Sequence, residues 1–109
     1  MLLVKARNAA LWFFFATAGL DPVVAAQAAT HTVIIDSVRY KPDTITVRRG
    51  DTVVWVNQDP FPHTVTAKGV FGSHEIPAGK SWKYTPRKAG EYIYVCTLHP
   101  TMKGTLKVE

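Results

Sequence analysis

Three side chains that bind soft metals follow one another at three-residue intervals near the end of the chain: Cys96, His99 and Met102. A thiolate, an imidazole and a thioether together favour copper over harder ions. A second imidazole, His63, lies upstream in a proline-containing segment, and a loop could bring it to the other three. Two histidines, a cysteine and a weak methionine are typical of a blue copper electron-transfer site. The sequence therefore predicts that these four residues bind one copper ion.

The cysteine count supports a metal for a second reason. Cys96 is the only cysteine, so the chain cannot form an intramolecular disulfide. A domain of about 80 residues has a marginal hydrophobic core and benefits from a crosslink. A metal held by ligands that are far apart in the sequence would provide that crosslink.

Three other kinds of site have to be weighed against a copper electron carrier. Zinc is the closest rival metal, but a thioether is a poor zinc ligand. A copper carrier or chaperone would use the same soft ligands and exchange its ion with a partner. A copper enzyme needs an additional metal centre or an open substrate position, and the sequence contains no second ligand cluster. We therefore expect an electron carrier that is not itself an enzyme, with copper carriage as the alternative.

Short β-like runs alternate with turn residues along the chain, a pattern typical of an all-β sandwich. The run at 52–57 is almost continuously apolar, which indicates burial on both sides or a central position in a sheet. Arg49-Gly50-Asp51 is interpreted as a hairpin turn. The expected strands cover residues 31–36, 44–48, 52–57, 63–67, 79–85, 91–96 and 104–109.

These strands would bring the ligands together at one end of the sandwich. Cys96 falls at the end of one expected strand and Gly104 begins the next, so a short loop would hold His99 and Met102. His63 would reach the same place from a separate connection. Prolines beside both histidines restrict the backbone, which should limit movement when the ion changes oxidation state.

The motif Tyr94-x-Cys96-x-x-His99-Pro100-x-Met102-x-Gly104 resembles the cupredoxins, and within them the amicyanin-like members of the plastocyanin/azurin group. Pro62-His63 and Gly50-Asp51-Thr52-Val53-x-Trp55-x-Asn57 extend the resemblance to about residues 31–109. It implies a single Greek-key β-sandwich and one type 1 copper that cycles between Cu(I) and Cu(II). It also implies a monomer that exchanges electrons with a redox donor and acceptor, such as a dehydrogenase and a c-type cytochrome.

Residues around the ligands are expected to support them. Asn57, just before the His63 segment, suits a role that ties the two ligand loops together, and Thr97 could join the same network. Leu98 stands where amicyanin has a proline, and its backbone N–H is expected to reach the Cys96 sulfur. Such a bond would lower the reduction potential relative to a Leu98→Pro variant.

The first 28 residues are predicted to be a signal peptide. Lys5 and Arg7 precede an apolar run at 9–20, and small residues follow, with cleavage after Ala26 or after Ala28. The apolar run is shorter than the roughly 20 residues of a spanning helix, so stable membrane insertion is not expected. The remaining domain, 29–109, is predicted to work in a bacterial periplasm.

The charge pattern gives no sign of nucleic-acid binding. The chain has 13 basic and 8 acidic residues; without Lys5, Arg7 and Asp21 the predicted domain has 11 and 7, a net charge of +4. Its basic residues are scattered rather than gathered with aromatic residues in one patch, as nucleic-acid binding requires. We interpret them as solvated surface that steers acidic partners.

Two further histidines are not expected to take part in the copper site. His74, beside Glu75, is interpreted as a solvated loop residue. His31 would be the third residue of a chain that begins at Ala29, and an amine followed by a third-position imidazole can chelate Cu(II). No physiological role is expected for that chelate.

Overall fold

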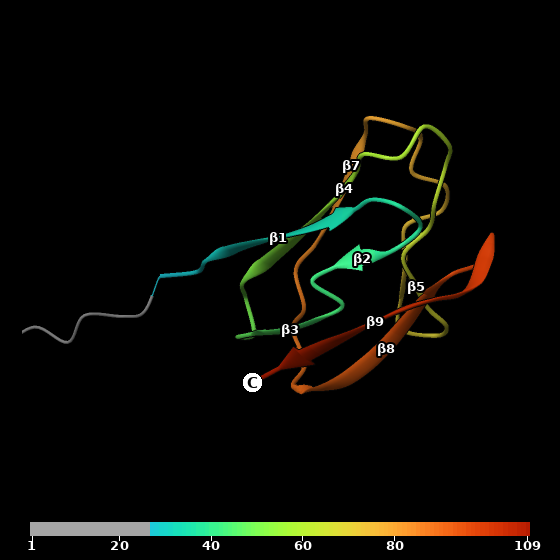
Figure 1. Cartoon of the computed structure of the whole chain (residues 1–109). Coiled ribbons are helices and arrows are strands. Elements are labelled where there is room, and N and C mark those ends of the chain that lie inside the picture. Colours follow the sequence, from blue (N-terminus) through green and yellow to red (C-terminus); the bar gives the residue numbers. More distant parts are fainter. Residues whose placement is uncertain (1–26) are drawn as a thin grey trace, which may run out of the picture.

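The computed structural model describes residues 27–109 (Figure 1). Residues 1–26 of the predicted signal peptide lie outside the described residues. Within residues 27–109, no helix has the length and apolar character needed to cross a membrane.

Nine strands make up the described part of the chain. Six of them are four residues or longer, and three are two-residue strands. In chain order they are β1 (Thr30–Ile35), β2 (Tyr40–Lys41), β3 (Thr44–Val47), β4 (Thr52–Asn57), β5 (Thr66–Ala67), β6 (Phe71–Gly72), β7 (Ser81–Tyr84), β8 (Gly90–Cys96) and β9 (His99–Val108).

The strands form two sheets that pack face to face. One sheet has the order β2-β1-β4-β7 and the other has the order β3-β9-β8-β5-β6. The β1/β4 and β3/β9 pairs are parallel, and the remaining pairs are antiparallel. The predicted Greek-key β-sandwich is confirmed.

Strand β4 shows how the sequence makes the core. Val53, Trp55 and Asn57 are buried, while the residues between them are half-buried, as the two-residue period of a strand requires. The expected central position is confirmed, since β4 lies between β1 and β7, but burial on both faces is wrong. Only the inward face of this apolar strand is fully covered.

Trp55 connects the two sheets through Tyr94 on β8. The ring centroids are 5.5 Å apart in an edge-on arrangement, and the Trp55 indole N–H donates to the Tyr94 hydroxyl at 3.2 Å. Gly104 on β9 leaves room for the Tyr94 ring, because a Cβ at that position would overlap it. Burial raises the pKa of Tyr94 to about 12.

Several expected elements differ from the observed ones. The turn at 49–51 joins β3 to β4, which belong to different sheets, so it is a crossover and not a hairpin. The expected strand at 63–67 is reduced to Thr66–Ala67, and His63 forms a single bridge with Ile76. The short strands β2 and β6 were not expected, because two-residue strands carry no detectable period.

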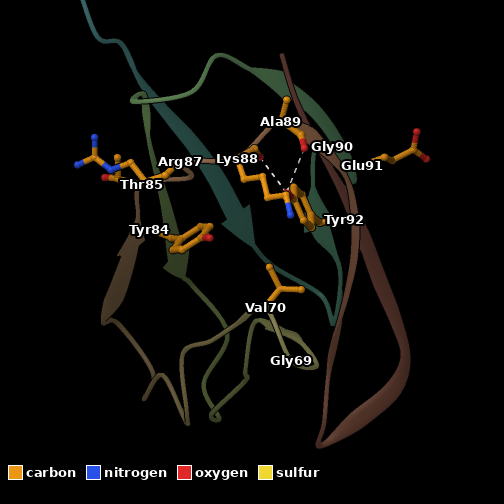
Figure 2. Close-up of a pocket in the computed structure, with 10 residues that line it drawn as sticks. All are labelled: Gly69, Val70, Tyr84, Thr85, Arg87, Lys88, Ala89, Gly90, Glu91 and Tyr92. Atoms are coloured by element: carbon orange, nitrogen blue, oxygen red, sulfur yellow. Dashed lines mark hydrogen bonds between the residues drawn. The ribbon is translucent and has the colours of Figure 1, made fainter.

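The start of β8 is fixed by a tyrosine corner. The Tyr92 hydroxyl donates to the Lys88 carbonyl at 2.8 Å. A hollow of about 620 Å³ lies beside this corner, between the Gly69–Val70 turn and residues 84–92 (Figure 2). None of the four predicted ligands lines it.

The first described strand and the last one meet the same turn. The Thr52 N–H donates to the Ala29 carbonyl at 2.9 Å, and the Arg49 N–H donates to the Glu109 carbonyl at 3.1 Å. Figure 1 shows the beginning of β1 and the C-terminus on the left of the molecule, with the β8–β9 connection on the right.

Candidate metal centre

The β8–β9 hairpin carries two of the donors on facing positions. Val95 pairs with Lys103, but the next residue, Cys96, pairs with His99. Moving one residue along β8 therefore corresponds to moving four residues along β9. Residues 100–102 have no partner in this register and form a bulge. The expected loop up to Gly104 is wrong, since β9 begins at His99 and only Thr97 and Leu98 lie between the strands.

His63 approaches from the segment between β4 and β5. Its backbone N–H donates to the Ile76 carbonyl at 3.2 Å, and the Ile76 N–H donates back to the His63 carbonyl at 2.7 Å. The side chain is completely buried. Phe61 packs against it with ring centroids 5.2 Å apart. The imidazole is thus held by backbone pairing on one side and an aromatic ring on the other.

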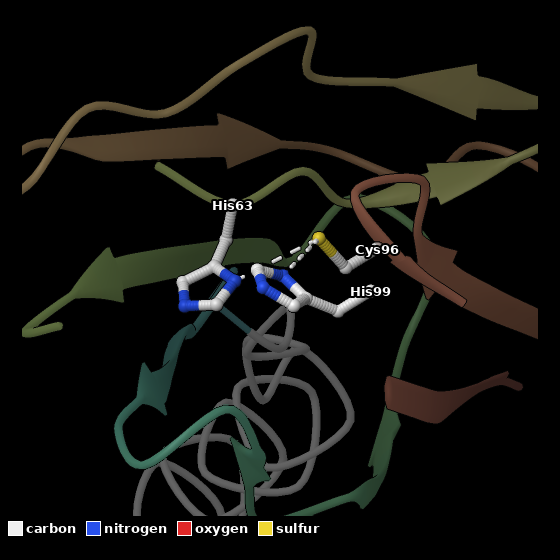
Figure 3. A group of neighbouring side chains, drawn as sticks. All are labelled: His63, Cys96 and His99. Carbon is white, nitrogen blue, oxygen red and sulfur yellow. Dashed lines mark hydrogen bonds between the residues drawn. The ribbon is translucent and has the colours of Figure 1, made fainter. Parts of the chain in front are cut away.

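The three strong donors converge (Figure 3). The Cys96 sulfur lies 3.7 Å from His63 Nδ1 and 3.8 Å from His99 Nδ1, and the ligand atoms of the three residues all lie within 4.8 Å of one another. A thiolate about 2.3 Å and an imidazole about 2.0 Å from one ion, about 120° apart, are separated by about 3.7 Å. The separations fit a single metal ion.

Met102 lies on the inward face of β9. It is 4% exposed and shares that face with Gly104 and Leu106, two and four residues further on. It belongs to the irregular stretch between His99, which pairs with Cys96, and Lys103, which pairs with Val95.

The Cys96 sulfur accepts a backbone hydrogen bond, but from a residue that the sequence did not indicate. The donor is the Thr64 N–H, at 3.3 Å. The hydrogen bonds of the described residues include none from Leu98 to this sulfur, so that expectation is wrong. The turn at Thr97–Leu98 carries the Leu98 N–H at the tip of the hairpin, while Thr64 follows the buried His63 directly.

Asp59 orients the His63 ring. Its carboxylate lies 2.7 Å from His63 Nε2 and accepts the N–H groups of Ser37 at 2.7 Å and Val38 at 2.9 Å. Burial alone would raise the pKa of Asp59, but these hydrogen bonds, led by that from Val38, lower it below its ordinary value. When the carboxylate accepts a hydrogen bond from Nε2–H, the ring proton stays on Nε2 and Nδ1 is free to bind a metal.

Asn57 organises the His63 segment from within. Its side-chain amide donates to the Phe61 and Ile76 carbonyls, both at 2.9 Å, and its oxygen accepts the Asp59 N–H at 2.9 Å. These contacts all lie in residues 57–76, so Asn57 does not reach the hairpin that carries Cys96.

The connection between the two ligand segments runs through Thr64 and Thr97. The Thr97 N–H donates to the Thr64 hydroxyl at 2.9 Å, and the two hydroxyls are 3.2 Å apart. Sequence reasoning missed both Thr64 and Asp59. Both residues could have been suspected from the sequence, because they are polar and flank His63 in a segment that must be buried to bring His63 to the metal.

The remaining two histidines lie outside the donor group. His74 is exposed, as predicted. His31 is half-buried, and its Nε2 lies 2.9 Å from a carboxylate oxygen of Asp51. Neither contributes to the cluster of His63, Cys96 and His99.

A two-sheet Greek-key sandwich with a buried Cys-His-His cluster at one end is the architecture of a cupredoxin. The family model of the cupredoxin-like domain matches residues 6–108, and the chain belongs to this family. The match begins before the predicted domain boundary at residue 29, which stays a prediction. The donor chemistry fits one type 1 copper ion as the cofactor.

Individual relatives agree with the amicyanin-like resemblance. The amicyanin of Paracoccus versutus is 34% identical over 96 residues, which cover 81% of this chain and 73% of that protein. A mutant amicyanin solved in its Cu(I) form superposes with a TM-score of 0.68, at 32% identity, over 79% of this chain and 86% of that one.

A solved copper-containing enzyme is matched over a much smaller share of its length. The copper-containing nitrite reductase of Thermus scotoductus superposes with a TM-score of 0.70, at 28% identity, over 84% of this chain but 26% of the enzyme chain. The chain thus corresponds to the small carriers and to one part of the larger enzyme.

Proposed function

We propose that this blue copper electron-transfer protein holds its ion through His63, Cys96 and His99, with Met102 as a weak fourth ligand. The observation that carries the proposal is the convergence of two imidazole nitrogens on one buried sulfur, at 3.7 and 3.8 Å. Copper supplies the one-electron chemistry when bound. The thioether of Met102 favours copper over zinc.

The protein's own residues keep the ligand positions fixed between oxidation states. Asp59 holds the His63 ring, and the Thr64 N–H donates to the Cys96 sulfur. A hydrogen bond to a thiolate withdraws electron density from it and tunes the reduction potential. Because these contacts restrain both the imidazole and the sulfur, little reorganisation is needed when an electron arrives or leaves.

His99 is the proposed exit for the electron. Its side chain is half-exposed, in contrast with the buried His63 and Cys96. Two exposed apolar side chains lie near it. The Phe61 ring, 39% exposed, is 5.8 Å from the His99 ring, and Leu98, 45% exposed, directly precedes His99 in the chain. Pro60, which precedes Phe61, and Pro100, which follows His99, are also exposed. Such a surface suits brief docking of a redox partner.

A charge placed on this surface tests the docking role. Leu98→Asp and Pro60→Asp should slow electron exchange with a partner protein while the visible spectrum stays the same. Val70→Asp is a matched control, since Val70 is 51% exposed but lines the hollow beside the tyrosine corner. Unchanged exchange rates in the first two variants, or an equal loss in the control, would contradict the exit at His99.

The cellular setting is proposed from the leader and from the family. Export to a bacterial periplasm follows from the predicted signal peptide, with a dehydrogenase as electron donor and a c-type cytochrome as acceptor. A modest positive charge on the domain favours acidic partners. We propose that the protein acts there as a monomer.

A Cu(II) titration followed by visible absorption and EPR tests the copper assignment. We expect an intense sulfur-to-copper charge-transfer band with narrow hyperfine splitting, reversibly bleached by ascorbate. Cys96→Ser should remove the band, and His74→Ala should leave it, because His74 is exposed and outside the donor group. An ordinary Cu(II) spectrum in the wild type would contradict the proposed ligand set.

The half-exposed His99 also favours a second candidate, a copper carrier that exchanges its ion. An exchanging site must open readily to a competing ligand. Release of Cu(I) to a chelator within seconds, with irreversible voltammetry, would support copper carriage; slow release with reversible voltammetry would support electron transfer.

A further inference from the structure

A buried carboxylate lies at the end of the sandwich opposite the metal centre. Asp51, in the turn between β3 and β4, is 3% exposed. Its Oδ1 accepts a hydrogen bond from the Ala29 N–H at 2.9 Å. Its Oδ2 accepts one from the Arg48 N–H at 3.1 Å and lies 2.9 Å from His31 Nε2. The hydrogen bond from Ala29, followed by those from His31 and Arg48, holds the pKa of Asp51 well below its ordinary value.

This buried anion has no permanently charged partner among the described residues. Its recorded ion pair is with His31, which is a cation only when protonated. Arg48 and Arg49 line a hollow of about 150 Å³ next to Asp51, together with Gln27 and Ala28, but neither guanidinium forms an ion pair with the carboxylate. A buried charge without a counter-charge is costly, so a cation at one of the three donor positions would be favourable.

We propose that the exported protein begins at Ala29 and that Asp51 binds its free α-ammonium group. This inference rests on the export proposed above. Hydrolysis of the Ala28–Ala29 bond by the signal peptidase of the exporting cell consumes one water and leaves a carboxylate on Ala28 and an amine on Ala29. The amine takes up a proton at neutral pH. The nitrogen that donates to Asp51 at 2.9 Å then carries a positive charge.

The structure distinguishes the two cleavage positions that the sequence leaves open. Cleavage after Ala26 would leave Gln27 and Ala28 in front, so the Ala29 nitrogen would remain an uncharged amide. The ammonium would then lie two residues away, roughly 6–7 Å further along an extended chain. Only cleavage after Ala28 puts the new charge against the buried carboxylate. Other charged groups here are His31 on β1, Arg48 and Arg49 in the turn, and Glu109, whose carbonyl accepts from Arg49.

The same arrangement competes with a Cu(II) chelate at the new N-terminus. Such a chelate needs the amine, the imidazole of His31 and the backbone nitrogens between them. In the folded domain the Ala29 nitrogen and the His31 ring both bind Asp51. Thr30 and His31 are paired with Thr52 and Val53 in the β1/β4 ladder. Chelation would have to break these contacts.

The first test is the N-terminus of the full chain expressed with its own leader. Intact mass and N-terminal sequencing of the exported protein should give Ala29. A start at Gln27 would overturn this inference and leave the copper function untouched. A retained leader would overturn both the inference and the proposed export. The copper titration does not depend on which N-terminus is found. Failure of the proposed ion pair can therefore be distinguished from failure of the proposed copper site.

The second test measures the ion pair itself. Ala28→Gln puts a large side chain at the position where the signal peptidase requires a small one for cleavage after residue 28. Cleavage should then occur after Ala26, so the variant begins at Gln27. The wild type, beginning at Ala29, should unfold about 4–8 °C higher than this variant at pH 7. The amine has a raised pKa in the folded state, so its contribution is full below about pH 8 and is lost as the pH rises through that raised value. The difference between the two N-termini should shrink as the pH rises through the pKa of the amine in the folded state.

The Asp51→Asn variant completes the comparison. With the charge on residue 51 removed, the two N-termini should give equal unfolding temperatures at pH 7, which isolates the pairwise effect from any general loss of stability. Equal temperatures for the two N-termini in the presence of Asp51 would overturn the proposal, even if processing occurs at Ala29.

Discussion

The two segments that carry the predicted ligands are built in opposite ways. In the segment at 57–66, His63 is completely buried and its Nε2 lies against the Asp59 carboxylate. The Asn57 amide donates to the Phe61 and Ile76 carbonyls on either side of it. The hairpin at 96–102 ends in exposed residues, and its histidine, His99, is half-exposed. The His99 ring packs against the rings of Phe61 and His63, and its Nδ1 lies 3.8 Å from the Cys96 sulfur.

This difference separates two tasks that a redox site has to perform. A fixed, buried imidazole defines the coordination geometry and excludes water. An imidazole at the surface brings the metal close to a partner, and the exposed apolar residues beside it make contact. The following predictions test this division, beginning with the largest expected effect.

Removing either histidine should have very different consequences. In His99→Gly, added imidazole can enter from solvent, so it should restore the intense visible band of the Cu(II) protein. In His63→Gly, the vacated position is fully enclosed, and the same imidazole concentration should restore none of it. The measurement is visible absorption during an imidazole titration. Equal recovery in the two variants would show that burial does not distinguish the two ligands.

Asn57→Ala should be the most destabilising of the remaining changes. It leaves the Phe61 carbonyl and the Asp59 N–H without their partner and removes one of the two donors to the Ile76 carbonyl, which keeps the His63 N–H. Each unsatisfied buried group costs about 1–3 kcal/mol. We expect a loss of about 3 kcal/mol in the free energy of unfolding of the metal-free protein, measured with denaturant. Gln58→Ala, at the exposed neighbour, should change it by less than about 0.5 kcal/mol.

Asp59→Asn should weaken copper binding more than it weakens the fold. The amide keeps the shape of the carboxylate but loses the charge that orients His63 through Nε2. Removing such a partner typically lowers metal affinity by about 10–100-fold. Competition with a chelator measures the affinity. Asp36→Asn, which removes an exposed ion pair with Lys41, should leave it unchanged.

Thr64→Val should have the smallest effect of the four. It removes the hydroxyl that accepts the Thr97 N–H but keeps the Thr64 backbone N–H on the sulfur. We expect a loss of about 1 kcal/mol in the free energy of unfolding and an unchanged visible band. A shifted band would mean that this hydroxyl, and not only the backbone, sets the position of the thiolate.

The sequence predicted the longer strands, because each has apolar residues that alternate or run together over four or more positions. It also predicted the cluster of His63, Cys96 and His99, since residue types with strong metal chemistry were spaced to suit two loops. It failed where structure depends on tertiary pairing. The two-residue strands and the extended start of β9 have no local period of their own. The turn at 49–51 was recognised, but its local signal does not tell which sheets it joins.

The supporting residues were the least predictable part of the site. Asn57 was noticed for its place before the His63 segment, but its contacts depend on how that segment folds back on Ile76. The Thr64 N–H could not be distinguished from that of Leu98 without knowing which backbone faces the sulfur. Every residue except proline has a backbone N–H, so the residue types do not tell which one donates to the sulfur.

The meeting of both ends of the described chain at the turn between β3 and β4 has a practical consequence. Ala29 and Glu109 each hydrogen-bond to that turn, whereas the proposed electron exit lies at the other end of the sandwich. A tag or an electrode linker attached after Glu109 would therefore leave His99 facing outward. The domain is suited to oriented immobilisation, and a circularly permuted version would need only a short connector between its original ends.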